Sequence, residues 1–480
     1  MKRKEFLKMV GVTAAATAVL PSIPLSSFAK RSAIPSKRPP ADERRFRSEV
    51  IDNYIQDMQG KIADETLAWM FGNCFPNTLD TTVFQGTYKD KPDTFVITGD
   101  IHACWLRDSS AQVWPYMDFL TQDENLAAMV KGLINRHSNS VNLDPYANAF
   151  CMDEESFCAA FPDDMPRAKN GVFERKWEVD SLCYVIRLSH RYWKETKDTS
   201  FMDNDWLLAM DTIVETFKTE QRKDGKTPYS YSRCSDRMTD TSFASGLGRP
   251  FHPTGAICSS FRPSDDSTMW NFLVPSNLFA ISMLKKLEEM LKSAGKGDDI
   301  IPKARTLREE VEKAMKEYAV VKHRHFGKIY CYEFDGLGNH NFMDDANVPS
   351  LLSASYLDAL DHNDHLYKNT RKFALSDKNG WFFKGTAAEG IGGPHTGYNK
   401  IWPMSIAMRG ITSDSEKEVE QCIKYLLTTH DNTGFMHESF NMDDPSDYTR
   451  EWFAWANGLF GEFIIHISRK YPHLLKKKYV

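Results

Sequence analysis

Acidic residues in two loops of this chain could carry acid–base chemistry. Glu438 lies in GFMHESF, ahead of the aromatic run WFAWANGLF, and Asp265 and Asp266 are adjacent in RPSDD. Two adjacent aspartates repel each other, so we expect one of them, in an aromatic and partly dry site, to have a raised pKa and act as a general acid. A general acid and a second carboxylate are what glycosyl transfer to water requires. The alternative is that Ser264 or Asp265 only caps a helix.

Two further motifs place acidic residues where helices begin. Arg107 and Asp108, in ITGDIHACWLRDSS, could grip sugar hydroxyls, because the arginine donates hydrogen bonds and the aspartate accepts them. An N-cap aspartate beside a surface arginine is the alternative. Glu178 and Asp180, in ERKWEVDS, have an ordinary explanation as first-turn acids that interact with the helix dipole.

A glycine-rich loop, EGIGGPHTGYNKIWP, carries His395 and Trp402, which we expect to face whatever the loop surrounds. It lacks the lysine and the Ser/Thr of a phosphate-binding loop. The pair His437–Glu438 could suggest a metal site, yet no H-E-x-x-H helix and no third ligand accompany it. The sequence therefore predicts acid–base chemistry without a metal or a cofactor.

The elements that must position these residues are mostly helical, judged from the spacing of apolar residues. The segment KIYCYEFDGLGNH predicts a β-hairpin that turns at Asp335-Gly336. About a dozen helices with unequal connections favour an all-α barrel of paired helices, and the missing internal repeat disfavours a helical solenoid. We expect helices over residues 46–75, 107–120, 124–136, 177–195, 205–221, 275–293, 301–318, 348–360, 364–375, 400–410, 415–428 and 450–471.

Composition narrows the class of partner. The 480 residues include 60 basic and 65 acidic side chains without a basic stripe, so nucleic acid is not an expected partner. Eleven Trp, 18 Tyr and 30 Phe suit sugar stacking, although most of them will form the core. The nine cysteines form no C-x-x-C pair. Most should be buried thiols, and Cys151 and Cys158 are the nearest pair for a disulfide.

The N-terminus is typical of a secretory signal. Residues 1–29 combine a basic start, a short apolar stretch and the small-x-small site Ser27-Phe28-Ala29, and RKEFLK is similar to the twin-arginine export motif. We expect residues 30–45 to be a polar linker and residues 46–480 to form one catalytic domain. The apolar stretch is too short to span a membrane, so we expect an exported protein of the periplasm.

Five blocks, in this order, resemble those of a known family: TGDIHACWLRDSSAQVWPY, ERKWEVDSLCY, FRPSDD, IWPMSIAMRGIT and GFMHESF with WFAWANGLF. The family is glycoside hydrolase family 125, the metal-independent exo-α-mannosidases. The resemblance implies a barrel of six helix pairs, an inverting mechanism, and action on non-reducing terminal α-1,6-linked mannose. The chain departs from the family's pattern at His102, where an apolar residue is typical, and this departure bears on fine substrate preference.

By this resemblance the general acid is Asp265, with Asp266 as the alternative, and the general base is Glu438, which would activate a water. His437 and Ser439 could help to orient that glutamate. The resemblance also implies that the terminal sugar is bound by Arg107 and Asp108, with Arg262, His395 and Trp402 as neighbours.

Other functions remain compatible with these motifs. One is another helical-barrel glycosidase of the glucosidase or trehalase type, one is a non-catalytic glycan-binding protein, and one is a metal-dependent mannosidase. The sequence leaves open the natural glycan and the oligomeric state.

Overall fold

The structure is a computed structural model that describes residues 34–479, so the predicted signal peptide lies outside the described residues. The chain divides into two compact units, Met1–Pro35 and Ser36–Val480. The second unit, which carries every candidate site residue, is described here.

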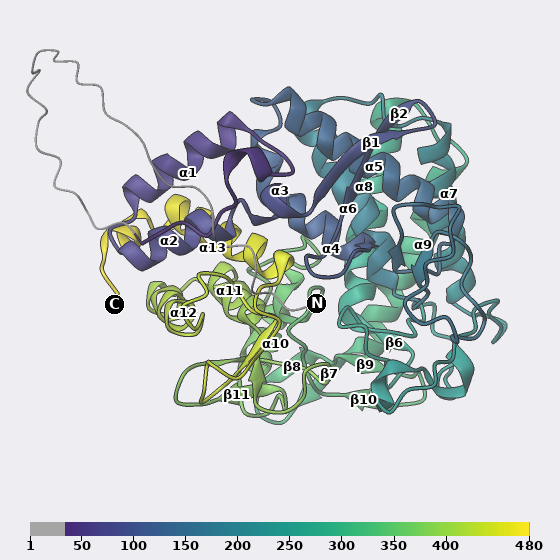
Figure 1. The fold of residues 1–480 in the computed structure, drawn as a ribbon. Helices are drawn as coiled ribbons and strands as arrows, with labels where there is room; N and C mark the ends of the chain where they lie inside the picture. Colours follow the sequence, from purple (N-terminus) through teal and green to yellow (C-terminus); the bar gives the residue numbers. More distant parts are fainter. Residues whose placement is uncertain (1–33, 480) are drawn as a thin grey trace, which may run out of the picture. The chain divides into compact units, whose positions relative to one another are not determined.

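An inner ring of six elements forms the barrel (Figure 1). Each packs against the next, and the last returns to the first. Five are α-helices and one, η6, is a single 3-10 turn. In ring order they are α4 (Leu106–Val113), α6 (Val179–Thr196), α8 (Val274–Ala294), η6 (Leu352–Ala354), α11 (Pro403–Ile411) and α13 (Ala454–Lys470).

Outer helices cover this ring, and five of them follow an inner element in the chain. The remaining position, outside α13, is filled by helices from the start of the domain. The outer helices are α5 (Glu124–Leu143), α7 (Asn204–Glu220), α9 (Ile300–Ala314), α10 (His365–Ala374) and α12 (Glu416–Thr428), with α1 (Glu49–Lys61), α2 (Glu65–Cys74) and the short α3 (Asn77–Thr81) beside α13. The predicted α/α barrel is confirmed.

The sequences of inner and outer helices differ as their places require. In α12 the buried residues Val419, Cys422, Ile423, Leu426 and Leu427 follow the spacing of a single apolar face. In α6 the run from Val179 to Ser189 is buried without interruption, because α4 and α8 pack against it and α5 lies behind it. Such a helix is buried on all sides.

Small antiparallel sheets occupy the connections. Three have three strands: β3 (Cys104–Trp105), β4 (Ala149–Phe150) and β5 (Val172–Glu174); β6 (Phe272–Leu273), β9 (Glu333–Phe334) and β10 (His340–Asn341); and β13 (Lys400–Ile401), β14 (Ser439–Asn441) and β15 (Tyr448–Thr449). Three have two: β1 (Val83–Tyr88) with β2 (Lys91–Val96), β7 (Val320–His323) with β8 (Gly327–Tyr330), and β11 (Phe382–Lys384) with β12 (Glu389–Ile391).

These sheets bear on the position of the site, because β3, β6 and β13 each lead directly into an inner helix. The predicted hairpin is present as β9 and β10, and the Asp335 carboxylate accepts hydrogen bonds from the backbone of the turn. It is shorter than predicted, because residues 328–330 belong to β8, which pairs with β7.

The prediction of one helix over residues 46–75 is wrong. The chain leaves α1 at Ile62, and α2 begins three residues later. The Asp64 carboxylate accepts a hydrogen bond from the backbone N–H of Leu67, 2.9 Å away, and so caps a new helix. Spacing of apolar residues alone does not reveal such a break.

The prediction of a helix over residues 348–360 is also wrong, since only the turn η6 forms there. Asp344 accepts hydrogen bonds from the backbone N–H groups of Leu351 and Leu352, and the Tyr184 hydroxyl donates to the carbonyl of Val348. These side chains from outside the segment satisfy backbone groups that a helix would pair internally. One inner position of the barrel is therefore occupied by a loop that side-chain hydrogen bonds hold in place, instead of by a helix.

The domain begins earlier than the predicted linker allows. Arg38 forms ion pairs with Asp52 and Asp80, each at 2.7 Å, and the backbone N–H of Lys37 donates to Asn73. Residues 36–45 therefore pack on the helical domain.

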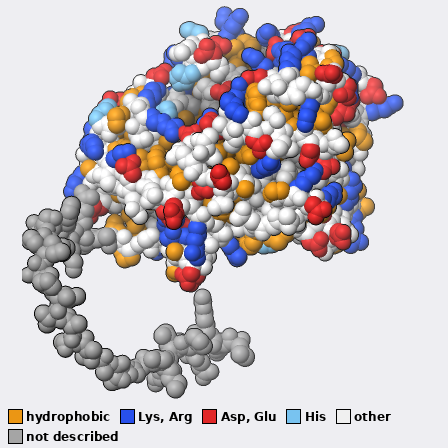
Figure 2. Space-filling model, turned by 90° about the horizontal axis from the view of Figure 1, so that it is seen from above, with side chains coloured by type: hydrophobic (Ala, Val, Ile, Leu, Met, Phe, Trp, Pro, Cys, Tyr) orange, Lys and Arg blue, Asp and Glu red, His pale blue; other side chains and the backbone are white. Residues whose placement is uncertain are grey.

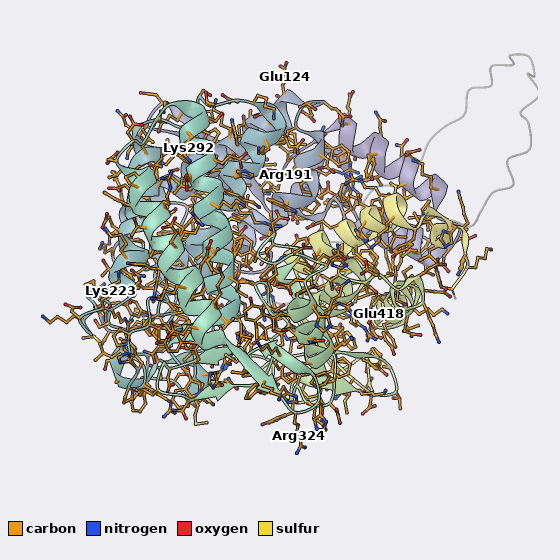
Figure 3. All side chains as sticks on the ribbon, turned by 180° about the vertical axis from the view of Figure 1, so that it is seen from behind. Glu124, Arg191, Lys223, Lys292, Arg324 and Glu418 are labelled. Carbon is orange, nitrogen blue, oxygen red and sulfur yellow. A yellow bond between two sulfur atoms is a disulfide. The ribbon has the colours of Figure 1, made fainter. Side chains whose placement is uncertain are left out.

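The outer surface is polar and mixed in charge. Charged side chains such as Lys223 and Arg324 project from the periphery in Figure 3, and both signs are interspersed on the face shown in Figure 2. Among the described helices, none is both long and apolar enough to cross a bilayer.

Candidate active site

A cavity of about 570 Å³ lies where the inner elements begin. Much of its wall comes from the N-terminal ends of α4, α6, α8, η6, α11 and α13 and the loops before them, and residues 160–161 and 233–240 complete it. Helix N-termini carry partial positive charge, which favours carboxylates nearby. Members of the wall include Arg107, Asp108, Glu174, Lys176, Asp265, Asn347, His395, Trp402, Glu438, Arg450, Phe453 and Trp455.

Arg107 is the centre of a buried cluster of carboxylates. Its Nη1 lies 2.5 Å from Glu178 and 3.3 Å from Asp180, and its Nη2 lies 3.0 Å from Asp265. Its Nε lies 3.4 Å from Asp108. The first-turn acids of α6 are thus partners of an arginine on α4, and the helix dipole alone does not account for them.

Asp108 is a buried carboxylate of the cavity wall, with its Oδ2 3.4 Å from Nε of Arg107. Burial raises its pKa to about 6, against the attraction of Arg107. Its Oδ2 is buried, and among the described residues nothing forms a hydrogen bond with it; the same holds for the indole Nε1 of Trp105, another residue of the wall. Buried polar atoms usually have partners, so an acceptor and a donor here suit the hydroxyl groups of a bound sugar.

The two aspartates of RPSDD face different surroundings. Asp265 has a φ of 64°, a left-handed conformation that aspartate tolerates better than most residues. Its side chain is 23% exposed and lines the cavity. The side chain of Asp266 is 2% exposed, accepts from Ser264 at 3.2 Å, and does not line the cavity.

Neither aspartate has the raised pKa that the sequence led us to expect. Burial favours the neutral form of Asp265, but the charges of Arg107 and Lys176 outweigh it and lower its pKa. Burial likewise opposes the ionised form of Asp266, and His395 outweighs it. The raised pKa values belong to other carboxyls of the cluster: complete burial raises the pKa of Glu178 well above its usual value despite the charge of Arg107, and raises the pKa values of Asp108 and Asp180 to about 6.

His395 lies close enough to Asp266, Asp265 and Glu438 for all three carboxylates to affect its charge. Its Nδ1 lies 3.7 Å from Asp266, and its carbonyl accepts from Arg237 at 2.8 Å. Burial lowers its pKa, but Asp266 foremost, and then Glu438 and Asp265, raise it above the usual value overall. A protonated His395 would be a hydrogen-bond donor at the cavity wall.

Glu438 approaches the cavity from the loop before α13. The side chain is 12% exposed, and one carboxylate oxygen lies 3.5 Å from Nη1 of Arg450. Arg450 also pairs with Asp100, on the turn before β3. The arginine thus links the glutamate to another part of the wall.

The neighbours of Glu438 in the chain point elsewhere. His437 donates from Nδ1 to the carbonyl of Glu451, 2.7 Å away, and stacks on Tyr448 with ring centres 3.8 Å apart. Ser439 shares a hydrogen bond of 2.7 Å with the hydroxyl of Thr449. Both side chains support the backbone around Glu438.

Aromatic rings complete the wall. Trp402, Phe453 and Trp455 are nearly buried and lie edge to face in series, with ring centres about 6.2 Å apart at each step. His395 packs against the Trp402 ring at 6.1 Å. This arrangement offers apolar surface on which the C–H face of a sugar can rest.

A second charged network was missed by sequence reasoning. Lys176 donates to Asp240 at 2.8 Å and to the backbone carbonyl of Asp265 at 2.9 Å, and Arg233 lies 2.9 Å from Glu174 and 3.1 Å from Asp240. All five residues line the cavity. The charged motif ERKWE contains Glu174 and Lys176 and could have drawn attention to them. Their partners Arg233 and Asp240 lie in a loop about 60 residues later, which spacing in the sequence does not reveal.

Two residues singled out in the sequence lie outside the cavity wall. Arg262 is buried and donates to Glu333 at 2.7 Å, so its guanidinium anchors β9. His102 packs against the rings of Phe84 and Phe95, at 5.3 and 5.9 Å. The prediction that Arg262 contacts the sugar is not supported by its position.

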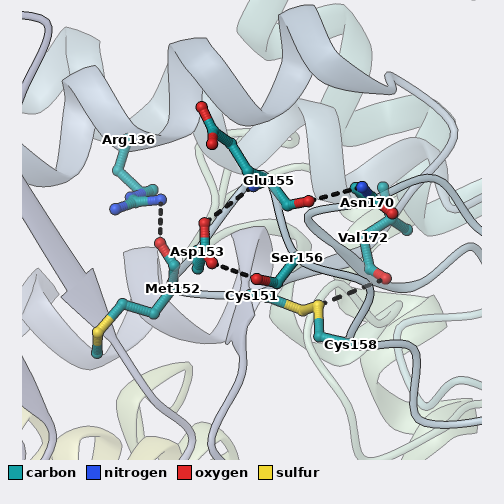
Figure 4. Close-up of a disulfide and its surroundings, with 9 residues drawn as sticks. All are labelled: Arg136, Cys151, Met152, Asp153, Glu155, Ser156, Cys158, Asn170 and Val172. Atoms are coloured by element: carbon teal, nitrogen blue, oxygen red, sulfur yellow. Dashed lines mark hydrogen bonds between the residues drawn. A yellow bond between two sulfur atoms is a disulfide. The ribbon is translucent and has the colours of Figure 1, made fainter.

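A disulfide lies just before one loop of the cavity wall. Cys151 and Cys158 are bonded (Figure 4). The other described cysteines are free, and all of them except Cys234 are buried. The loop that follows carries Phe161, which lines the cavity and lies over the Arg233 guanidinium, 3.5 Å from its ring centre. Within residues 34–479, no three His, Cys, Asp or Glu side chains gather closely enough to hold a metal ion.

Comparisons with known proteins agree on one family. The family model for metal-independent α-mannosidases (GH125) matches residues 64–465. A Schizosaccharomyces pombe protein, the meiotically up-regulated gene 157 protein, is 38% identical over 461 residues, covering 92% of this chain and 90% of that protein.

Solved structures agree with this match. A Streptococcus pneumoniae metal-independent α-mannosidase, in a non-productive complex with α-1,6-mannobiose, is 37% identical with a TM-score of 0.85, covering 89% of this chain and all of that one. A glycosidase with 9% identity and a TM-score of 0.50, covering 88% of this chain and 99% of that one, shares the fold alone.

Proposed function

Because this chain belongs to the family of metal-independent α-mannosidases, glycoside hydrolase family 125, we propose that it removes terminal α-1,6-linked mannose from the non-reducing ends of glycans. Family membership makes the chain an α-mannosidase and disfavours the glucosidase and trehalase alternatives. The linkage rests on the mannobiose bound by the streptococcal relative.

One observation supports the mechanism best. Asp265 and Glu438, 173 positions apart in the sequence, line the same cavity, and each is held by a different arginine. Glu438 acts as general base and takes a proton from water as the water attacks the anomeric carbon. Asp265 acts as general acid and protonates the leaving oxygen. The water attacks from the face opposite the leaving group, so the product is inverted.

The choice of Asp265 over Asp266 is supported by access. A general acid has to touch the leaving oxygen, and only Asp265 lines the cavity. Asp266 is enclosed by Ser264, His395 and Arg237, and so supports the loop and the histidine.

The proposed sugar-binding residues come from the wall of the cavity. Asp108 accepts from a sugar hydroxyl, and Trp105 donates to one through its indole nitrogen. Trp402 supplies stacking surface, and a protonated His395 supplies a donor. Arg107 keeps the surrounding carboxylates in place.

The chain is also proposed to be exported to the periplasm. The signal-like residues 1–29 and the disulfide, a bond typical of oxidising compartments, support this location. Edman sequencing of the protein recovered from the periplasm should begin at Lys30. An uncleaved N-terminus on protein found only in the cytoplasm would contradict it.

The decisive experiment follows the anomer released from α-1,6-mannobiose by NMR, with a chelator present. Immediate appearance of β-mannose is expected, because water attacks with inversion. Immediate α-mannose would exclude Glu438 as a base acting through water. Absence of any mannose, with binding retained, would favour a glycan-binding protein.

A further inference from the structure

Asp265 has to carry a proton in order to act, yet it lies beside Arg107 and Lys176, whose charges favour its ionised form. The charge of the surrounding cluster indicates where a proton can reside. Four carboxylates, Asp108, Glu178, Asp180 and Asp265, lie within 3.4 Å of the single Arg107 guanidinium. So many negative charges beside one positive charge in a nearly dry site favour retention of a proton.

Glu178 is the member of this cluster best placed to hold the proton. It is fully buried and does not line the cavity. Its Oε2 accepts from Arg107 at 2.5 Å and from Ser181 at 2.7 Å, whereas Oε1 has one longer contact, 3.4 Å from Nδ2 of Asn148. Its carboxyl group is within hydrogen-bonding reach of Asp265. A hydrogen on Oε1 can therefore be donated to Asp265.

Asn148 holds the two carboxyl groups together. Its Nδ2 lies 3.4 Å from Oε1 of Glu178 and 3.4 Å from Oδ1 of Asp265. Arg107 bridges the same two residues from its two terminal nitrogens. Two bridges of this kind fix the geometry through which a proton can pass.

We propose that Glu178 is a positioning residue that stores the proton which Asp265 delivers to the leaving oxygen. The inference rests on the proposed acid role of Asp265. The proton first passes from Glu178 to Asp265: the Glu178 O–H bond breaks, an Asp265 O–H bond forms, and the Glu178 carboxylate stays paired with Arg107 and Ser181. As the glycosidic bond breaks, this Asp265 O–H bond breaks in turn and a new O–H bond forms on the leaving oxygen. The proton that Glu438 takes from the attacking water leaves to solvent, and solvent returns one to the pair.

The charged groups around Glu178 and Asp265 determine in which direction a substitution of Glu178 shifts the pH dependence. Glu178 faces Arg107, Asp180 and Asp265, and Tyr229 lies nearby. Asp265 faces in addition Lys176, Asp108 and His395. Glu178→Gln removes the group that holds the shared proton and leaves Asp265 beside the cations of Arg107 and Lys176. Without that store, Asp265 loses its proton at lower pH than the pair does in the wild type.

The test compares Glu178→Gln with the wild type on α-1,6-mannobiose across pH. We expect the alkaline limb of kcat/KM to move down by about 1–3 pH units and turnover at pH 7 to fall more than about tenfold. An aryl mannoside with a good leaving group needs little protonation, so its kcat should fall much less. An unmoved alkaline limb with equal losses on both substrates would overturn the proposal.

Asp180→Asn is the matched control, because Asp180 contacts the same nitrogen of Arg107 and donates no hydrogen bond to Asp265; its own partner is Ser276. It should move the alkaline limb far less than Glu178→Gln. An equal movement would show that any charge near Arg107 has this effect, and would overturn the specific role of Glu178.

An infrared readout is independent of activity. At pH 6 the carbonyl band of a protonated carboxylic acid should be weaker in Glu178→Gln than in the wild type, since buried acids such as Asp344 and Glu462 contribute equally to both. An unchanged band would overturn proton storage even if the enzyme were inactive on every mannoside. If the variant does not fold, Asp265→Asn serves instead, because removal of the anion should lower the pH at which the Glu178 band titrates; an unmoved midpoint would overturn the proposal.

Discussion

A general base has to be held in place and has to remain able to accept a proton. At Glu438 a single contact among the described residues, with Arg450, holds the carboxylate. Arg450 lies 3.5 Å away and draws on Asp100 as a second partner, so the glutamate is oriented without being fully neutralised.

Glu438→Gln should bind α-1,6-mannobiose nearly as well as the wild type and lose about 10²–10⁴-fold in kcat, because an amide cannot accept the proton of water. Calorimetry measures the binding and a coupled mannose assay the turnover. Glu451→Gln is the control, since its side chain is exposed and only its carbonyl contacts His437. Comparable losses in the two variants would refute the role of Glu438.

Asp265→Asn and Asp266→Asn should differ in their dependence on the leaving group. Asp265→Asn should lose most of its activity on mannobiose and far less on an activated aryl mannoside, because the latter needs little protonation. Asp266→Asn should lower the activity on both substrates to a similar extent, since Asp266 acts by holding His395 and the loop. Measuring kcat and KM of both variants on both substrates distinguishes the two aspartates. The reverse pattern would identify Asp266 as the general acid.

Much of the site could be predicted from residue types, but its electrostatics could not. Asp108, Asp265, His395, Trp402 and Glu438 all line the cavity, as their motifs indicated. The expectation of a raised aspartate pKa failed because Arg107 and Lys176 come from segments about 160 and 90 residues away. Arg262 lies outside the cavity wall for a similar reason, since its partner Glu333 is 71 residues further on.

At the scale of elements, the bounds of helices with a clear apolar face could be predicted closely. Loops held in place by side chains from elsewhere in the chain could not be predicted. The prediction for α12, residues 415–428, agrees with Glu416–Thr428. The segment 348–360 has comparable apolar residues but is held by Asp344, Tyr184 and Tyr367 from other parts of the chain. Its conformation depends on tertiary contacts that spacing does not encode.

The disulfide loop offers a test at this scale. Cys158→Ser frees the loop that positions Phe161, so KM for long mannosides should rise about 3–10-fold with kcat little changed. The melting temperature should fall by only about 1–3 °C, because the bond closes a short loop. Reduction of the wild type should reproduce the effect, and the variant should not respond to reductant. A KM unaffected by either treatment would separate this loop from substrate binding.

At the scale of the whole molecule, buried acids give stability a dependence on pH. Burial raises the pKa of Asp344 to about 8 and that of Glu462 to about 7. Between about pH 4 and these values the folded chain keeps protons that the unfolded chain releases. The free energy of unfolding contributed by these groups is therefore greatest at low pH and falls as pH rises through this window.

Asp344→Asn should flatten the decline of the melting temperature between pH 5 and 8. It should also lower stability at pH 5 by about 1 kcal/mol, because one of two backbone N–H groups loses its acceptor. Calorimetry across pH provides the measurement. Asp414→Asn is the control, since the pKa of that partly exposed carboxyl is lowered by His362 and its titration lies below this window. Parallel curves for the wild type and Asp344→Asn would contradict the assignment.

The closure of the ring has a consequence for biosynthesis. Helix α13 packs between α4 and α11 and against α2 and α3, and the carbonyl of Leu475 accepts from the backbone N–H of Ala63. Helices α2, α3 and α4 are therefore made long before the helix that covers them. Until α13 is made, α2 and α4 expose the apolar faces that it covers, and a partly made chain is prone to aggregation. A stop codon a few dozen residues early would yield an aggregating product instead of a slightly shorter enzyme.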